Sequence, residues 1–369
     1  MARPACARID LEAIRYNYGL AKQLSGTNAV AIIKANAYGH GAVKVAEALA
    51  DEADAFGVAC IEEALELCES GIKQSVLLLE GVFTPDELEQ VDRLGMMMAV
   101  HTPEQLQWLL EAKPSRKLDV LLKLDTGMHR LGFKPERAKE LYAQLKACKH
   151  AGEVTLMSHF ARADEVGEAF SQVQLQRFQQ AITGLSVPVS MANSAGILAW
   201  PESHRAGRQG KLGSIESDWV RPGIMLYGAD PLDEPNEHSK RLKPVMSLES
   251  EVIAVCSLEA GERIGYGGRF QCDKPTRVGV VAMGYADGYP RHAVDGTPVS
   301  IDGQISRIIG KVSMDMLTVD LTDIPTAQIG SQVELWGEQI AVNDVAAHSS
   351  TIAYTLYTGI TRRVPLHYR

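Results

Sequence analysis

Eight apolar, strand-like runs alternate with helical segments over the first part of the chain, and this rhythm limits the possible folds more than any other feature. The runs lie near residues 29–34, 55–60, 75–80, 96–101, 118–124, 153–159, 187–192 and 219–227. Strands that alternate with helices form parallel βα units, and eight such units close into a TIM barrel rather than an open sheet. We therefore expect an α/β fold that begins with a (β/α)8 TIM barrel.

Polar residues follow several of these runs, at the positions where TIM barrels carry their active sites. They are Lys34 at the end of the first run, residues 125–130 after the fifth, His159 at the end of the sixth, Ser194 after the seventh, and Arg221 with Gly223 in the eighth. We expect these side chains to share one face of the barrel. The Gly- and Ser-rich segment 203–217 precedes the eighth run, so we expect an inserted loop on the opposite face without a catalytic role.

A polar segment with two prolines, residues 229–237, follows the barrel and is typical of a linker. Beyond it, short strand-like runs separated by glycine turns replace most of the helices, which indicates a β domain. One helix is expected at 342–347. We predict a barrel domain over residues 1–234, followed by a smaller, mostly β C-terminal domain over residues 235–369.

Composition and charge exclude several classes of function. The 369 residues carry a net charge of -9 without a cluster of Lys and Arg, so we expect no nucleic-acid partner. No apolar run reaches the roughly 18 residues of a membrane helix, and the N-terminal residues lack the apolar core of a signal peptide, so we expect a cytoplasmic protein without a membrane partner. Six cysteines without CxxC spacing and ten histidines without a metal-binding spacing predict neither disulfides nor a metal site.

One lysine ends the first apolar run, in the sequence Ala-Val-Ala-Ile-Ile-Lys-Ala-Asn-Ala-Tyr-Gly-His-Gly at residues 29–41. An ammonium group at the end of a buried strand loses hydration, which disfavours its charged form and makes the amine of Lys34 available as a nucleophile or base. The alternative is a lysine that simply extends from the strand end into solvent. Residues 33–41 resemble the lysine segment of the alanine racemases, enzymes that depend on pyridoxal 5′-phosphate (PLP) and attach it to this lysine.

Four further segments carry the same resemblance: residues 125–133, 264–270, 284–291 and 313–316. The resemblance spans the chain and implies interconversion of L- and D-alanine with PLP as cofactor. A racemase of broader amino-acid range stays open as an alternative. A non-catalytic PLP-binding barrel protein and a related decarboxylase are disfavoured, because neither needs a second domain with a tyrosine such as Tyr266. Supply of D-alanine for peptidoglycan and catabolism of alanine both remain open as biological roles.

The resemblance also implies which barrel residues hold the cofactor. The PLP phosphate would be held by Tyr38, Ser194, Gly223, Ile224 and Tyr354. Arg221 would face the pyridine nitrogen and, as a group that keeps its proton, would leave that nitrogen unprotonated and limit side reactions. His159 would pack beside the ring, and Arg130 would contact the phenolic oxygen and the substrate carboxylate. Lys123 matches a position that is carbamylated in several relatives. Judged by residue type alone, structural roles are equally open. Ser194, Gly223 and Ile224 would then be ordinary turn residues, His159 a core histidine and Lys123 a solvated lysine.

Racemisation requires that a proton leaves one face of the substrate Cα and returns to the other, so two bases are needed. The resemblance implies that Lys34 serves one face and Tyr266 the other, while Tyr285, Met314 and Asp315 line the substrate side. It further implies a head-to-tail homodimer with shared active sites, in which Lys34 of one chain meets Tyr266 of its partner. The alternative is that one chain supplies both bases.

Overall fold

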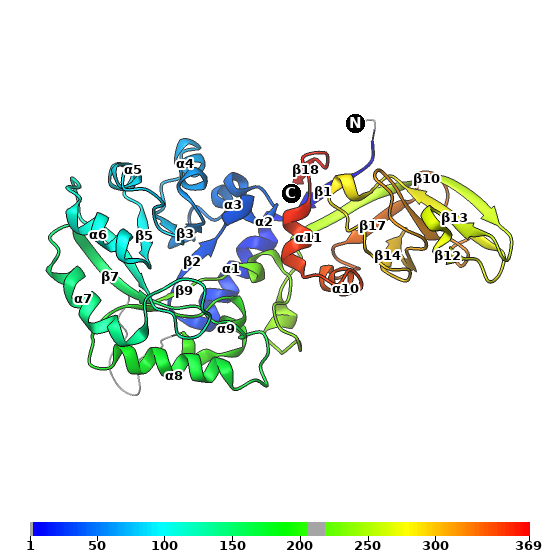
Figure 1. The fold of residues 1–369 in the computed structure, drawn as a ribbon. Helices are drawn as coiled ribbons and strands as arrows, with labels where there is room; N and C mark the ends of the chain where they lie inside the picture. The colour runs from blue at the N-terminus through cyan, green and yellow to red at the C-terminus, as the bar shows by residue number, and fades with distance from the viewer. Residues whose placement is uncertain (1–2, 205–217) are drawn as a thin grey trace.

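The protein, described here from a computed structural model of residues 3–204 and 218–369, consists of a barrel and a mostly β part that lie side by side (Figure 1). Eight parallel strands form a closed barrel in chain order, and Asn28 of the first strand pairs with Trp219 of the last. They are β2 (Asn28–Ile32), β3 (Ala55–Val58), β4 (Val76–Leu78), β5 (Met97–Val100), β6 (Leu118–Lys123), β7 (Ala151–Met157), β8 (Val189–Ser190) and β9 (Trp219–Val220). The predicted TIM barrel is confirmed.

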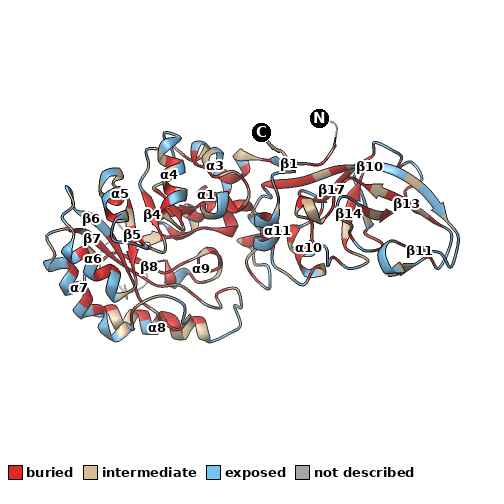
Figure 2. Cartoon of the chain, turned by 45° about the horizontal axis from the view of Figure 1, so that its top comes forward, coloured by how far each residue is buried: buried red, intermediate tan, exposed pale blue. Residues whose placement is uncertain are grey.

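Helices surround this barrel because its short, apolar strands are buried on both faces. Figure 2 shows buried residues concentrated in the strands and exposed residues on the outer sides of the helices. Asp10 caps the first helix, since its Oδ1 accepts from the Ala13 N–H at 2.9 Å. The helices are α1 (Leu11–Ser25), α2 (Lys34–Tyr38), α3 (Ala42–Ala48), α4 (Ile61–Glu69), α5 (Glu87–Leu94), α6 (Pro103–Glu111), α7 (Ala138–Ala147), α8 (Phe170–Ile182) and α9 (Ser194–Ala199).

The C-terminal part is built on an eight-stranded sheet, which confirms the predicted mostly β domain. Six strands run in the order β15-β14-β17-β10-β1-β18, and β13 with β16 extends the sheet from β10. The strands are β1 (Cys6–Ile9), β10 (Met246–Leu258), β13 (Thr276–Val281), β14 (Pro298–Ile301), β15 (Gln304–Arg307), β16 (Leu317–Asp320), β17 (Gln332–Trp336) and β18 (Leu366–Tyr368). A small hairpin, β11 (Arg263–Ile264) with β12 (Phe270–Gln271), and the helices α10 (Val342–His348) and α11 (Ala353–Gly359) complete it.

The N-terminal strand β1 belongs to this second sheet and not to the barrel. It pairs antiparallel with β10 and parallel with β18, with Ala7 opposite both Leu248 and Leu366. Neither β18 nor α11 is expected from the sequence, because each is short and α11 contains two threonines and a glycine. The domain boundary at residues 234 and 235 stays a prediction.

A stack of buried aromatic rings joins the two parts. The ring of Tyr227 stacks on His40 at 4.5 Å between centroids, His40 meets the edge of Tyr357 at 4.8 Å, and Tyr357 meets Trp336 at 6.5 Å. Tyr357 lies on α11, so the C-terminal helix packs directly against the barrel segment that follows Lys34. The barrel opening and the β domain are therefore held in one arrangement by packing.

Within the described ranges 3–204 and 218–369, no helix is long and apolar enough to cross a membrane. The same residues contain no group of three His, Cys, Asp or Glu side chains that could hold a metal ion. The insertion predicted at 203–217 lies outside the described residues from residue 205 onward.

Candidate active site

Lys34 lies just past the strand that was expected to contain it. Strand β2 ends at Ile32, and Lys34 begins α2, so the prediction that the strand stops at Lys34 is wrong by two residues. Residues 35–38 then form a left-handed turn with φ between 51° and 53°. Side chains such as Ala and Tyr cost about 1–2 kcal/mol per residue in this conformation, so the surrounding contacts must impose it.

Two side chains hold the left-handed turn in place. The backbone N–H of Ala35 donates to Glu63 Oε1 at 2.7 Å, and Asn36 Oδ1 accepts from the N–H of Ala42 at 2.8 Å. The turn belongs to the five-residue segment Lys34–Tyr38. Half-buried Lys34 at its start and buried Tyr38 at its end are thus brought close together at the C-terminal end of the barrel.

Ser194 and Gly223 meet beside Tyr38. The Ser194 Oγ accepts from the backbone N–H groups of Gly223 at 2.8 Å and Met225 at 3.3 Å, which leaves its hydroxyl hydrogen to donate. A Cβ atom at residue 223 would lie 2.9 Å from Tyr38 Oη, so only glycine leaves that hydroxyl its place. Burial raises the pKa of Tyr38 to about 12, which keeps the phenol protonated as a hydrogen-bond donor. The hydroxyls of Tyr38 and Ser194, beside Gly223, form a cradle of donors suited to an anion.

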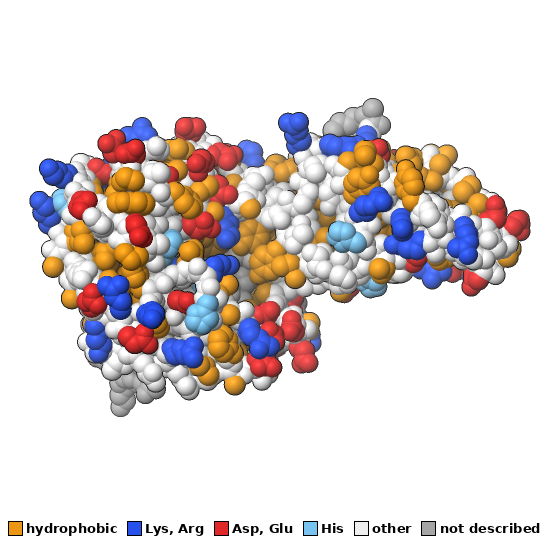
Figure 3. Space-filling view, viewed as in Figure 1, with side chains coloured by type: hydrophobic (Ala, Val, Ile, Leu, Met, Phe, Trp, Pro, Cys, Tyr) orange, Lys and Arg blue, Asp and Glu red, His pale blue; other side chains and the backbone are white. Residues whose placement is uncertain are grey.

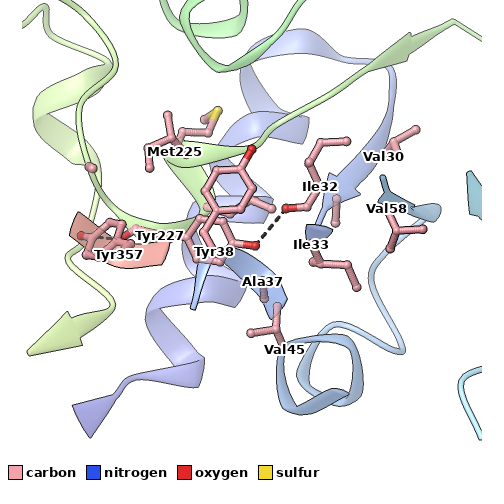
Figure 4. Packing of buried hydrophobic residues seen from close by; sticks show 14 of the residues in the cluster. Val30, Ile32, Ile33, Ala37, Tyr38, Val45, Val58, Met225, Tyr227 and Tyr357 are labelled. Atoms are coloured by element: carbon pink, nitrogen blue, oxygen red, sulfur yellow. Dashed lines mark hydrogen bonds between the residues drawn. The ribbon is translucent and has the colours of Figure 1, made fainter. Parts of the chain in front are cut away.

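The ring of Tyr38 is fixed by two other tyrosines. Tyr227, on the 3₁₀ turn η3 (Ile224–Tyr227), stacks on it at 4.8 Å and donates from its hydroxyl to the carbonyl of Ile32 at 2.9 Å (Figure 4). Tyr354 of α11 lies 5.8 Å from it between ring centroids, and burial raises the pKa of Tyr354 above its ordinary value. Tyr227 was not expected among the site residues. The sequence offers one signal for Tyr227, namely that an aromatic residue shortly follows Gly223.

Arg221 is a buried cation with neutral partners. It is 3% exposed, and its Nη1 donates to Ser190 Oγ at 2.5 Å while Nη2 donates to the carbonyl of Ser158 at 2.6 Å. Within the described residues no carboxylate pairs with it, and burial lowers its pKa to about 10. A buried guanidinium without a counter-ion is costly unless its donors are used, so the site suits an electron-rich group here. Sequence reasoning missed both serines, although each ends or directly follows a barrel strand.

His159 lies against Arg221 and is uncharged. Its Nδ1 accepts from Arg221 Nη2 at 3.3 Å, so the ring hydrogen is on Nε2. The pKa of His159 is held well below its usual range. Burial is the largest cause, and the nearby positive charges of Arg221, Lys123, Arg130 and Lys34 follow. A flat, neutral ring fixed in this way can pack beside another aromatic ring.

Four cationic side chains therefore gather at this face of the barrel. Lys123, the last residue of β6, is buried, and burial followed by the charges of Arg221 and Arg130 lowers its pKa to about 8. Lys123, Arg130 and His159 line one small cavity, and Arg130 itself is exposed in the loop after β6. This concentration of positive charge favours anionic ligands such as a phosphate and a carboxylate.

The residues predicted from the second domain lie elsewhere. Tyr266 is 65% exposed on the turn η5 (Tyr266–Gly268) between β11 and β12, and that hairpin occupies the end of the β domain away from α2 (Figure 1). Tyr285, Met314 and Asp315 form another group, in which the N–H of Ala286 donates to the carbonyl of Met314 at 2.9 Å. The chain thus brings together the predicted barrel residues with Tyr354, but not Tyr266 with Lys34.

Comparison with known proteins decides the family. Residues 9–231 match the family described as alanine racemase, N-terminal domain, and residues 245–368 match alanine racemase, C-terminal domain. The chain belongs to the alanine racemase family. The family predicted from the motifs is confirmed, and the match extends over both parts of the fold.

Curated relatives of this family resemble the chain over its full length. An alanine racemase of Azoarcus sp. strain BH72 is 53% identical over 100% of this chain and 99% of its own. A protein of Pseudomonas aeruginosa named alanine racemase, catabolic, is 51% identical, with 99% of each chain covered.

Solved structures of alanine racemases share the whole fold. The crystal structure of the biosynthetic alanine racemase from Pseudomonas aeruginosa matches with a TM-score of 0.93 and 43% identity, over 100% of this chain and 99% of that one. The alanine racemase from Bartonella henselae, whose structure contains covalently bound pyridoxal phosphate, matches with a TM-score of 0.86 and 31% identity over 99% of each chain.

Proposed function

We propose that this chain interconverts L- and D-alanine with PLP as its cofactor, by a two-base mechanism in which Lys34 and Tyr266 are the bases. The observation that carries the proposal is membership of the alanine racemase family over both domains, with the motif lysine beside a cradle of donors at the C-terminal face of the barrel. The cytoplasmic location expected from the sequence stays a prediction.

The barrel residues fit PLP. Tyr38, Ser194 and the backbone of Gly223 and Ile224 would hold its phosphate, with Tyr354 closing the cradle from α11. Arg221 would face the pyridine nitrogen and, because a guanidinium keeps its proton, would donate a hydrogen bond without protonating that nitrogen. Bound PLP supplies an electron sink that makes the hydrogen on the substrate Cα acidic. With an unprotonated ring nitrogen this sink is weak, which suits a reaction that only returns a proton.

The proton transfers fall to two side chains. The amine of Lys34 would take or return the proton on one face of the substrate Cα, and the hydroxyl of Tyr266 would do so on the opposite face. Arg130 would orient the substrate carboxylate with its guanidinium fork. The exposure of Tyr266 leaves its hydroxyl free to reach a second molecule.

Lys123 would brace Arg130 as a carbamate. A lysine whose pKa is lowered to about 8 is partly neutral near neutral pH, and the neutral amine is the form that adds carbon dioxide. The negative charge gained would offset some of the repulsion among Lys123, Arg130 and Arg221. The burial of Lys123 among cations supports this assignment.

The active site would be shared between two chains. Tyr266 lies at the far end of the β domain from α2, so the base for the opposite face would come from a second copy in a head-to-tail homodimer. In Figure 3 apolar side chains lie between Lys and Arg on the visible face of the β domain, a mixture that suits contact with another chain. Tyr285, Met314 and Asp315 would line the substrate side from the same domain.

Exchange in deuterium oxide tests the two bases. The PLP-loaded protein should convert each alanine enantiomer into the other and take up deuterium at Cα. Polarimetry measures the inversion, and mass spectrometry measures the deuterium. Tyr266→Phe should abolish inversion, yet one enantiomer should still exchange its α-hydrogen through Lys34 while the other does not. The control is Tyr16→Phe, which changes another exposed tyrosine, on α1. Equal exchange of both enantiomers by Tyr266→Phe would refute the second base, and the same assay with serine and lysine measures the substrate range.

A further inference from the structure

A buried carboxylate in the β domain is held by two arginines from opposite ends of the chain. Asp287 is fully buried, and Arg3 binds it with both terminal nitrogens, Nη1 to Oδ1 at 2.5 Å and Nη2 to Oδ2 at 2.7 Å. Arg363 Nε lies 3.4 Å from the same Oδ1. A carboxylate in the interior requires such partners, so this group is a built feature of the domain and not a surface ion pair.

The sheet explains why both arginines arrive at one point. Strands β1 and β18 lie parallel, with Ala7 opposite Leu366. Arg3 shortly precedes β1 and Arg363 shortly precedes β18, so the two segments enter the sheet side by side from the same end. Arg3 and Arg363, which are 360 positions apart in the chain, therefore present their guanidinium groups to one carboxylate as a consequence of strand pairing.

The same network reaches the loops that carry the predicted substrate-side residues. Asp287 ends the turn η6 (Tyr285–Asp287), and its Oδ2 accepts from the N–H of Gly284 at 2.8 Å. Arg3 Nη2 also donates to the carbonyl of Asp315 at 2.8 Å, and Arg363 Nη2 donates to Asp315 Oδ1 at 2.7 Å.

Backbone hydrogen bonds tie these two loops to each other. The N–H of Tyr285 donates to the carbonyl of Ser313 at 3.1 Å, and Gly284 packs so closely on Met314 that a Cβ there would lie 2.3 Å from the Met314 carbonyl oxygen. A shift in either loop must therefore move the other. The arginines fix both loops from one side.

We propose that Arg3 is a positioning residue for the substrate side of the active site, acting through Asp287 and Asp315 on the loops that carry Tyr285 and Met314. The inference rests on the proposed function, because it takes those residues to line the substrate path. Without Arg3, the buried carboxylate of Asp287 draws Arg363 toward itself. Asp315 then loses the hydrogen bond that its carbonyl accepts from Arg3 and the ion pair of its carboxylate with Arg363. The loops then lose their fixed spacing, while Lys34 and Tyr266 keep theirs.

Arg3→Gln tests this role, with Arg8→Gln as the matched control. Arg8 lies on β1 itself and pairs with Glu249 at 2.6 Å, where both side chains face solvent in part. We expect Arg3→Gln to raise the KM for alanine about three- to tenfold with kcat within about twofold, because it weakens binding contacts and spares the bases. Amide hydrogen exchange should become faster in residues 284–288 and 312–316, since their mutual hydrogen bonds open more often. Arg8→Gln should change neither measurement.

Arg3→Lys separates charge from geometry. It keeps the cation but cannot bind both oxygens of Asp287 and the Asp315 carbonyl together, so its KM should fall between those of the wild type and Arg3→Gln. If Arg3→Gln fails to fold, Arg3→Lys decides by the same KM, kcat and exchange measurements. The proposal is overturned if KM is unchanged or if kcat falls by as large a factor as KM rises. It is also overturned if hydrogen exchange is unchanged in both loops. A wild type that does not racemise alanine would instead overturn the proposed function, whereas the exchange comparison would still decide whether Arg3 holds the loops.

Discussion

The barrel and the β domain contribute to the predicted site in opposite ways. In the barrel, Ser194 and Arg221 are buried and hold defined hydrogen bonds to neighbouring loops. In the β domain, Tyr266 and Met314 are more than half exposed, at 65% and 52%. The barrel residues are fixed by contacts within the chain, whereas Tyr266 and Met314 leave most of their side chains to solvent. The contrast favours a site completed by a second copy.

The two regions also differ in whether their charged side chains have partners of opposite charge. Among the described residues, the barrel cation Arg221 has hydrogen bonds to neutral groups and no carboxylate partner, and other cations outnumber the one carboxylate, Glu80, that acts on Lys123. Several arginines of the β domain are paired with carboxylates, as Arg3 is with Asp287 and Arg269 is with Asp295 at 3.0 Å. Unpaired buried charge is costly and marks a binding site, while paired charge shapes loops.

The strongest test of the barrel half is Lys34→Ala. Racemisation should fall by at least about 10³-fold, because the amine that binds the cofactor and moves the proton is lost. The far-ultraviolet circular dichroism should stay unchanged, and the borohydride-reducible absorbance band should disappear. Lys44→Ala, which removes an exposed lysine of α3, is the control. A variant still reducible at a single lysine would show that another residue holds the cofactor.

A mixture of defective chains tests whether the two regions meet between chains. Lys34→Ala and Tyr266→Phe should each be nearly inactive, yet each mixed dimer should hold one intact site of two, so purified heterodimers should regain up to roughly half of wild-type activity. Activity is measured by polarimetry on heterodimers purified through two tags. Heterodimers no more active than their parents would mean that one chain supplies both bases.

Arg221→Glu tests the uncompensated charge of the barrel. A carboxylic acid at this position can protonate the pyridine nitrogen, which strengthens the electron sink and prolongs the carbanion. Racemisation should slow by about 10²-fold, and side transamination, measured as pyruvate formed, should rise. The same ratio of products as in the wild type would show that Arg221 does not face the ring nitrogen.

Gly223→Ala tests the close packing of the barrel cradle with a smaller effect. The new Cβ would lie 2.9 Å from Tyr38 Oη, so the hydroxyl must move, and the affinity for PLP should fall by about tenfold. Titration of the apo protein with PLP measures this loss. Gly19→Ala on α1 adds a methyl group where no atom lies within 4 Å and should leave the affinity unchanged. Equal affinities of the two variants would place the phosphate elsewhere.

The smallest expected effect is the one that Lys123 has on stability. Its folded pKa is lowered from 10.5 to about 8, so between these values the unfolded chain binds more protons and the free energy of unfolding should rise with pH. Lys123→Met should flatten that rise and add roughly 1–3 kcal/mol at pH 7 in buffer free of carbon dioxide. Urea unfolding across pH 7 to 10.5 measures it, with Lys44→Met as control. A wild-type stability flat over this range would contradict the buried, neutral lysine.

The sequence alone determined the barrel and the face on which Ser194 and Arg221 lie. Eight apolar runs between helices predict closure, and polar residues directly after a parallel strand must share one face, so Ser194 and Arg221 could be placed together without coordinates. The linear motif around Lys34 and the segment with Tyr266 were likewise enough to predict the family. These inferences succeed because each depends on residues close together in the chain.

Only the tertiary structure decided the features that join distant segments. Local pattern could not place β1 beside β18, or Arg3 on Asp287, because strand pairing depends on register and on which backbone edge is free. The left-handed turn after Lys34 was equally hidden, since Ala and Tyr do not prefer that conformation and adopt it only where surrounding contacts impose it. The barrel half of the site can therefore be predicted from local sequence. The placement of the β-domain half depends on strand pairings that form only when the whole chain folds.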